Sequence, residues 1–204
     1  MKSNIVLTSA AALLVSVAGA SALEYRPFVG LSMGIQGAIY SSDAKDIERA
    51  ANIDFPKDFF AFGVVGGVRA GGYEDIYNGG ITLSATKSTY SKVQKKYVDI
   101  RAASADLFDI SVSYDNYIRI SGDKANRIDL VFGAGMGAAA YHMDPVKGGS
   151  DTVWSFAPEL KIGMDFELTK SITLSATFRT IFPTNPNHNL NASYFAGGSV
   201  KYLF

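Results

Sequence analysis

The chain has 204 residues, a length that suits a single domain, and its 19 basic and 19 acidic side chains give a formal net charge of zero. A chain without a basic excess lacks the electrostatic signature of nucleic-acid binding, so we expect no nucleic-acid partner. The absence of cysteine excludes disulfides, thiolate metal sites and thiol nucleophiles, whereas 20 glycines, 13 phenylalanines and 11 tyrosines favour turn-rich β structure.

The first segment, Met1–Ala22, has the three parts of a secretory signal peptide. Lys2 supplies the positive start, Ile5–Val17 is apolar and uncharged, and Ala20-Ser21-Ala22 forms a small-x-small cleavage site. The apolar part has roughly a dozen residues, which is too short for a transmembrane helix. We therefore expect an exported protein with a signal peptide at residues 1–22 and one mature domain at residues 23–204.

Apolar and polar residues then alternate along about eight segments, and a period of two residues is that of an extended strand. No later segment has the long apolar run of a spanning helix, so a membrane location would require a closed β-barrel. The apolar faces are, in chain order, Val29, Leu31, Met33, Ile35 and Ile39; Phe60, Phe62, Val64, Val68 and Ala70; Ile81, Leu83 and Ala85; Phe108, Ile110, Val112 and Tyr114; Ile128, Leu130, Phe132, Ala134 and Met136; Trp154, Phe156, Leu160, Ile162, Met164 and Phe166; Ile172, Leu174, Ala176, Phe178 and Phe182; and Tyr194, Ala196, Gly198, Val200, Tyr202 and Phe204.

The connections between these segments are alternately long and short. The long ones are Ser41–Asp58, which suits a solvated loop, the basic Ser91–Ser104, His142–Thr152 and Pro183–Asn191; the short ones are a Gly-rich link after Ala70, Ser121–Asn126 and Leu168–Ser171. An even number of strands joined in this way is typical of a small outer-membrane barrel, with long loops outside the cell and short turns in the periplasm.

A soluble β-sandwich has the same alternation, with its apolar face turned inward. Export, polar faces rich in Gly and Ser, and aromatic residues near strand ends favour the barrel, whose interior is crowded and whose rims carry aromatic girdles. The predicted fold is therefore all-β, an eight-stranded antiparallel transmembrane up-and-down β-barrel. The residues expected in the girdles are Tyr25, Tyr40, Tyr73, Tyr90, Trp154, Phe182 and Tyr202.

The last segment, Ser193–Phe204, ends on an aromatic residue with a second aromatic, Tyr202, two positions before it. This pattern resembles the C-terminal assembly signal of bacterial outer-membrane barrels. The resemblance implies that Tyr202 and Phe204 are recognised by the barrel assembly machinery.

The resemblance extends over most of the mature chain through Pro27–Gly30, Val131–Gly137, Ile162–Phe166 running into Ser171–Arg179, and the end of the last segment, Ala196–Phe204. Together they resemble the OmpA-like or opacity-type family of small outer-membrane barrels, which includes porin-like surface antigens. The resemblance implies a Gram-negative outer membrane, contact with its lipid and lipopolysaccharide, and a monomer. Unlike the two-domain members, this sequence carries no peptidoglycan-binding domain after Phe204, so we expect the barrel domain alone.

One glycine motif resembles a nucleotide-binding site but lacks the helix that such a site requires. Gly133–Ala138 fits the dinucleotide pattern G-x-G-x-x-A, with Glu159 where a ribose-binding acid would lie, yet Pro145 and the following glycines interrupt any crossover helix. We instead expect these glycines to leave room for rings of neighbouring strands in a narrow barrel, and we expect no cofactor.

The two histidines, His142 near Asp144 and His188 five residues before Ser193, are the only candidates for the catalytic base of a lipid A-modifying barrel enzyme. The spacing does not match the deacylase pattern, and no acid is adjacent to His188. Two histidines also make a poor metal site. We therefore assign no catalytic, cofactor-binding or metal-binding residue.

Charged residues on the polar faces should meet inside the barrel, where they must pair across strands. Such pairs would form a plug, although a narrow ion path remains an alternative. The predicted interior charges are Arg69, Asp109, Asp115, Asp129, Glu159, Lys161, Asp165, Arg179 and Lys201.

Specificity should reside in the loops. The basic stretch Lys92–Lys96 suits either simple solvation or contact with lipopolysaccharide phosphates or a host polyanion. The sequence thus predicts a non-enzymatic envelope structural protein or surface antigen, with adhesion through the loops as one form. A lipid A-modifying enzyme and a narrow porin-like channel are the alternatives.

Overall fold

The computed structural model of the chain describes residues 24–51, 53–54, 57–72, 75–90, 101–102, 104–122, 126–144, 151–185 and 190–204. The expected signal peptide, Met1–Ala22, lies outside the described residues, so its cleavage stays a prediction. The basic stretch Lys92–Lys96 and His188 also lie outside them.

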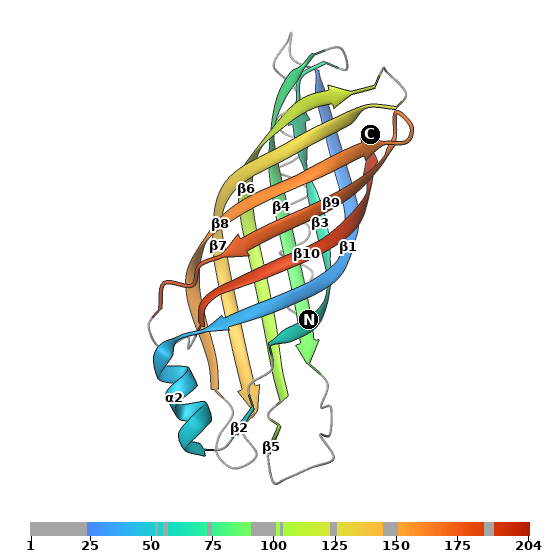
Figure 1. Cartoon of the computed structure of the whole chain (residues 1–204). Coiled ribbons are helices and arrows are strands. Elements are labelled where there is room, and N and C mark those ends of the chain that lie inside the picture. Colours follow the sequence, from blue (N-terminus) through green and yellow to red (C-terminus); the bar gives the residue numbers. More distant parts are fainter. Residues whose placement is uncertain are drawn as a thin grey trace, which may run out of the picture.

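Eight strands form one closed antiparallel β-barrel, which confirms the fold predicted from the alternation (Figure 1). Strands that follow one another in the barrel are hydrogen-bonded neighbours, and the first strand pairs with the last from Phe28↔Leu203 to Tyr40↔Leu190. The barrel strands are β1 (Tyr25–Tyr40), β3 (Asp58–Ala70), β4 (Tyr77–Tyr90), β6 (Ser104–Ser121), β7 (Ile128–Asp144), β8 (Asp151–Glu167), β9 (Ile172–Ile181) and β10 (Leu190–Leu203).

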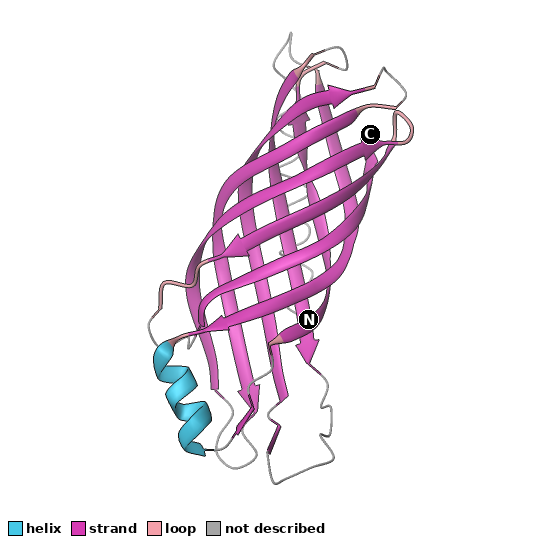
Figure 2. Ribbon diagram, in the orientation of Figure 1, coloured by secondary structure: helices cyan, strands magenta, loops and turns pink. Residues whose placement is uncertain are grey.

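Short turns lie at one end of the barrel, here called the turn end, and the long connections lie at the other, here called the loop end. In the turn after β8, the N–H of Leu168 donates to the carbonyl of Ile172 at 2.9 Å. Gly71 and Gly122, in the other two turns, have φ of 125° and 89°, which favours glycine. Figure 2 shows the same division, with the C-terminus at the turn end.

The segment Ser41–Asp58, predicted to be a solvated loop, contains the helix α2 (Ser42–Ala51) and the short strand β2 (Ile53–Asp54). Asp43 in the first turn of α2 and Arg49 in the last turn both complement the helix dipole. Alternation does not reveal such a short helix, because its charged residues suit a loop equally well. Among the described residues, no helix combines the length and apolar content needed to cross a bilayer.

Strands β6, β7 and β8 are longer than predicted, with 18, 17 and 17 residues. The predicted loop His142–Thr152 is correspondingly shorter, because His142 belongs to β7 and Thr152 to β8. A tilted strand needs about 9–11 residues to cross a bilayer. These strands therefore extend beyond the membrane.

The apolar faces point outward, as predicted. Leu31 is 70% exposed, Phe60 is 65% exposed and Ile162 is 53% exposed, whereas residues of the opposite faces are mostly buried. A soluble sandwich would bury the apolar face. The outward apolar wall therefore belongs to a membrane barrel.

The aromatic rims follow the prediction in part. Trp154 and Tyr202 lie on the outer wall, 55% and 51% exposed, and Phe182 is also exposed. Tyr40 was wrongly assigned to a girdle: it is 4% exposed and points into the barrel, because it shares the inward face of β1 with Gln36. Tyr73 and the side chain of Tyr90 lie outside the described residues. Tyr194, not predicted as a rim residue, has its ring over Gly37 and donates from its hydroxyl to Asp58 at 3.4 Å.

Candidate functional site

Arg179 of β9 holds the charged network nearest the loop end. Its Nη2 lies 2.7 Å from Oδ1 of Asp109, and its Nη1 lies 3.3 Å from Oε2 of Glu159. The guanidinium also donates to Ser84 and Thr86 at 2.9 and 2.5 Å. Arg179, Asp109 and Glu159 are all buried, so this one cation compensates two carboxylates inside the barrel.

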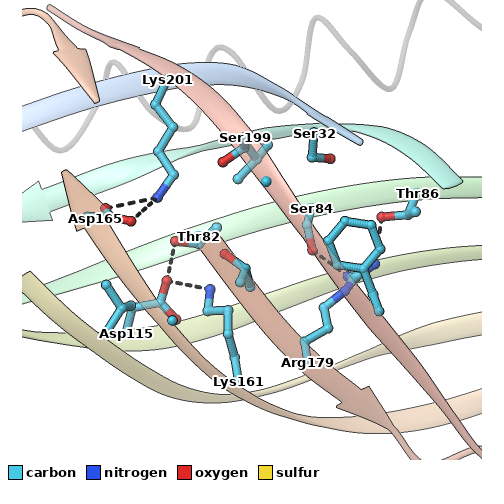
Figure 3. A pocket seen from close by; sticks show the side chains of 16 residues that line it. Ser32, Thr82, Ser84, Thr86, Asp115, Lys161, Asp165, Arg179, Ser199 and Lys201 are labelled. Atoms are coloured by element: carbon cyan, nitrogen blue, oxygen red, sulfur yellow. Dashed lines mark hydrogen bonds and ion pairs between the residues drawn. The ribbon is translucent and has the colours of Figure 1, made fainter. Parts of the chain in front are cut away.

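Two lysines form the middle networks, shown in Figure 3. Lys161 Nζ lies 2.5 Å from Oδ2 of Asp115, which also accepts from Thr82 at 2.5 Å. Lys201 Nζ contacts both oxygens of Asp165 at 3.0 and 3.1 Å. Each lysine is thus held by a carboxylate on another strand.

Three arginines meet near the turn end. Arg69 lies 2.6 Å from Asp129 and 2.9 Å from Glu167. Arg127 bonds Asp129 at 2.7 Å, and Arg26 contacts Glu167 at 3.4 Å. This network closes the turn end of the interior with buried side chains.

All the predicted interior charges point inward, and each takes part in one of these ion pairs. Glu159 pairs with Arg179, whereas Lys161 pairs with Asp115. Arg26, Arg127 and Glu167 also belong to these networks and are not among the predicted interior charges. Arg127 and Glu167 lie two positions from the predicted interior charges Asp129 and Asp165, and Arg26 lies on the inward face of β1. The alternation extended to the strand ends would therefore have found all three.

Glycines of β7 make the cross-barrel contacts possible. Gly133 lies in register between Asp115 of β6 and Lys161 of β8, and a Cβ on Gly133 would collide with the Asp115 carboxylate. Lys161 therefore reaches Asp115 over a residue without a side chain. The expected role was room for rings, but Asp115 and two serines occupy the space, and β7 continues as a strand through the dinucleotide-like motif.

An apolar layer lies above the charged networks, at the loop end. Tyr40 and Tyr141 meet edge to face with ring centroids 6.3 Å apart, and their hydroxyls are 3.1 Å apart. The buried residues of this layer are Ala38, Tyr40, Phe59, Leu107, Tyr141 and Leu190. It separates the charged interior from the loops.

Below the apolar layer, the middle networks enclose a cavity of about 50 Å³, lined among others by Ser84, Asp115, Lys161 and Arg179. A cavity of this size holds only a few water molecules. Buried ion pairs lie on both sides of it along the barrel. The geometry of the described residues therefore favours the predicted plug over an ion path.

We expect the reconstituted protein to show little or no conductance in a planar bilayer, because salt bridges fill the interior and the apolar layer covers it. Tyr40→Ala together with Tyr141→Ala should remain closed, since the Arg179 network still crosses the interior. Protein-free bilayers provide the baseline. A large, stable open state of the wild-type protein would contradict the plug.

His142 lies on the outer wall near the loop end, away from the interior networks. Its Nδ1 is 2.9 Å from the hydroxyl oxygen of Thr152, and Asp106 faces it on β6. His188 lies outside the described residues. Among the described residues, no three acidic or histidine side chains are grouped as metal ligands would be.

Comparison with solved structures identifies the fold. Neisserial surface protein A (NspA) matches with a TM-score of 0.55 and 13% identity, over 90% of this chain and 100% of that one. Ail, the attachment invasion locus protein of Yersinia pestis, matches with a TM-score of 0.51 and 13% identity, over 89% and 99% of the two chains. Ail in complex with the heparin analogue sucrose octasulfate matches with a TM-score of 0.53 and 14% identity, over 89% and 99%.

These similarities confirm the expected architecture, that of small eight-stranded outer-membrane barrels of the OmpA-like or opacity type. No protein-family profile matches the sequence, and no curated protein matches it significantly.

Proposed function

We propose that this chain, a barrel with the fold of small outer-membrane proteins, is a non-enzymatic surface protein that binds a polyanionic ligand through its loop end. Its interior is filled by paired charges and covered by an apolar layer, so the loop end is the surface available to bind a partner. The main support for this proposal is a short strand pair that joins the first two long connections into one surface.

A parallel pair of short strands makes this joint. Ile53 and Asp54 of β2 pair with Arg101 and Ala102 of β5 (Arg101–Ala102), at the end of the barrel where α2 also lies (Figure 1). Loops held together in this way can present their charges to one extended ligand, as function in such scaffolds commonly resides in loops.

Basic side chains of α2 are available on this surface. Lys45 is exposed, and Arg49 contacts Asp46 at 3.5 Å with 80% and 74% of the two side chains exposed. Such an exposed pair contributes about 0.2–1 kcal/mol, so Arg49 can exchange Asp46 for another anion at little cost. The basic stretch Lys92–Lys96 belongs to the same pair of connections in sequence.

The chemical class of the ligand is suggested by the Ail complex with a heparin analogue, since that sulfated sugar is a compact polyanion. We therefore take a sulfated or phosphorylated glycan as the ligand class, which includes both host polyanions and lipopolysaccharide phosphates.

The expected result is that a variant with Lys45, Arg49, Lys92, Lys95 and Lys96 all changed to Gln binds sucrose octasulfate about tenfold more weakly or worse than wild type. Each exposed charge contributes up to about 1 kcal/mol, and tenfold corresponds to about 1.4 kcal/mol. Calorimetry on detergent-solubilised protein measures the difference. Lys170→Gln, at the exposed turn end, is the matched control.

Unchanged binding in the five-fold variant would reject these loop-end cations as the polyanion site, and a wild-type protein that does not bind sucrose octasulfate would reject the polyanion as ligand. Location is tested separately: external protease on whole cells should cut the loops of a protein that fractionates with the outer membrane. Recovery from the soluble periplasm would reject the surface role itself.

The enzyme alternative gives a different expectation. His142→Ala and His188→Ala should leave lipid A unchanged, because His142 bonds Thr152 on the outer wall and no catalytic pattern surrounds His188 in the sequence. Mass spectrometry of lipid A from cells with each variant measures acyl-chain number. A change in that number would favour the enzyme.

A further inference from the structure

A groove of about 520 Å³ crosses the outer wall of the barrel over β6 to β9. Its apolar lining comprises Phe132, Ala134, Leu160, Ile162 and Phe178. It opens outward on the face that the fold presents to lipid, on the opposite side of the wall from the charged networks.

The concave shape follows from the register of two adjacent rows of outward residues. Phe132, Ile162 and Phe178 lie in one row, and Ala134 and Leu160 lie in the next. Ala134 is small and its neighbours are large, so the surface dips at Ala134 between Phe132 and Leu160. A uniform row of leucines would have made the wall smooth.

Three residues of the groove's lining, Asn116, Lys161 and Thr180, are polar, and the first two have their polar groups engaged elsewhere. Asn116, at one end, accepts a hydrogen bond from the Tyr77 hydroxyl and donates to the Phe132 carbonyl at 3.4 Å. Lys161 contributes backbone to the lining, because its ammonium group bonds Asp115 inside the barrel. An apolar occupant therefore leaves no buried group of Asn116 or Lys161 unpaired.

We propose that this groove binds one hydrocarbon chain of a membrane lipid. The groove is continuous with the lipid-facing wall, and a slender, flexible chain can fill a concave site that a convex partner would leave partly empty. A second copy of the barrel, packed wall to wall, would lose dispersion contacts over the groove. The inference depends on the barrel lying in a membrane and not on the ligand of the loop end.

Native mass spectrometry of protein purified from membranes in mild detergent tests the proposal. Wild-type protein should retain one lipid molecule, and Ala134→Phe, which fills the groove, should lose it. Ala85→Phe is the matched control, since Ala85 lies on the outer face of β4 between Val64 and Ile110, away from the groove. A heat-modifiable gel band shows that each variant is folded, and Ala134→Leu replaces Ala134→Phe if the larger side chain prevents folding.

Three results would overturn the proposal. The first is wild-type protein without retained lipid, and the second is equal lipid retention by both Phe variants. The third is a wild-type dimer that Ala134→Phe dissociates, which would make a second copy the occupant. None of these results bears on polyanion binding, so the proposed lipid site and the proposed polyanion site can fail independently of each other.

Discussion

Arg179→Met is expected to destabilise the folded barrel by about 3–5 kcal/mol, the cost of leaving buried carboxylates without their cation. Arg179 is the cation paired with both Asp109 and Glu159 in the described interior, and all three side chains are almost fully buried. Methionine fills similar space without charge, so the loss reports electrostatics more than packing. Urea unfolding in detergent, followed by the heat-modifiable band, measures the change.

The matched control removes all three charges at once. Arg179→Met combined with Asp109→Asn and Glu159→Gln should recover most of the lost stability, because no uncompensated charge remains in the barrel. Equal stability of wild type and the single variant would show that water already solvates these carboxylates. The interior would then be open and not plugged.

Deleting Phe204 should sharply lower the amount of inserted protein in cells and raise its periplasmic degradation. The pattern of Tyr202 and Phe204 resembles the signal by which outer-membrane barrels are recognised for assembly. In the finished barrel, the Phe204 ring is 73% exposed on the outer wall, with its centroid 5.2 Å from that of Tyr202. Its burial therefore contributes at most about 2–3 kcal/mol to the folded state.

The deletion variant should still fold into a compact barrel when refolded in detergent, which separates assembly from stability. Phe60→Ala removes a comparably exposed ring from the opposite rim and is the matched control. Quantitative immunoblots of outer-membrane fractions give the inserted amount. Insertion of the deletion variant at the wild-type level would make Phe204 an ordinary lipid-facing residue.

The alternation of residues sufficed to predict the faces of the strands, because a period of two allows only two sides and the apolar side must face lipid. It could not identify the partners of the interior charges. Lys161 pairs with Asp115 through the gap above Gly133, a contact set by the stagger of three strands. Tyr40 lies at a strand end, as a girdle residue does, but its side chain belongs to the inward face of β1. Position at a strand end alone therefore did not predict on which side of the barrel wall the ring lies.

The loop end was the least predictable part. A two-residue parallel pair such as Ile53–Asp54 with Arg101–Ala102 joins connections far apart in sequence and leaves no periodic trace. The helix α2 contains one isoleucine among small and charged residues, too little to distinguish it from a loop by its apolar pattern. Surface features without a buried face leave little periodic signal in an amino-acid sequence.

The seam between β1 and β10 also has a consequence for folding kinetics. Every other pair of neighbouring barrel strands is a hairpin of consecutive segments, whereas Phe28 must find Leu203 across nearly the whole chain. Hairpins can form early, but this closure has to wait until the C-terminal strand is available, and it carries the largest loop-closure entropy. Until then both seam strands expose unpaired backbone edges, the form most prone to aggregation. A chaperone that shields these two edges would therefore act at the slowest and most hazardous step.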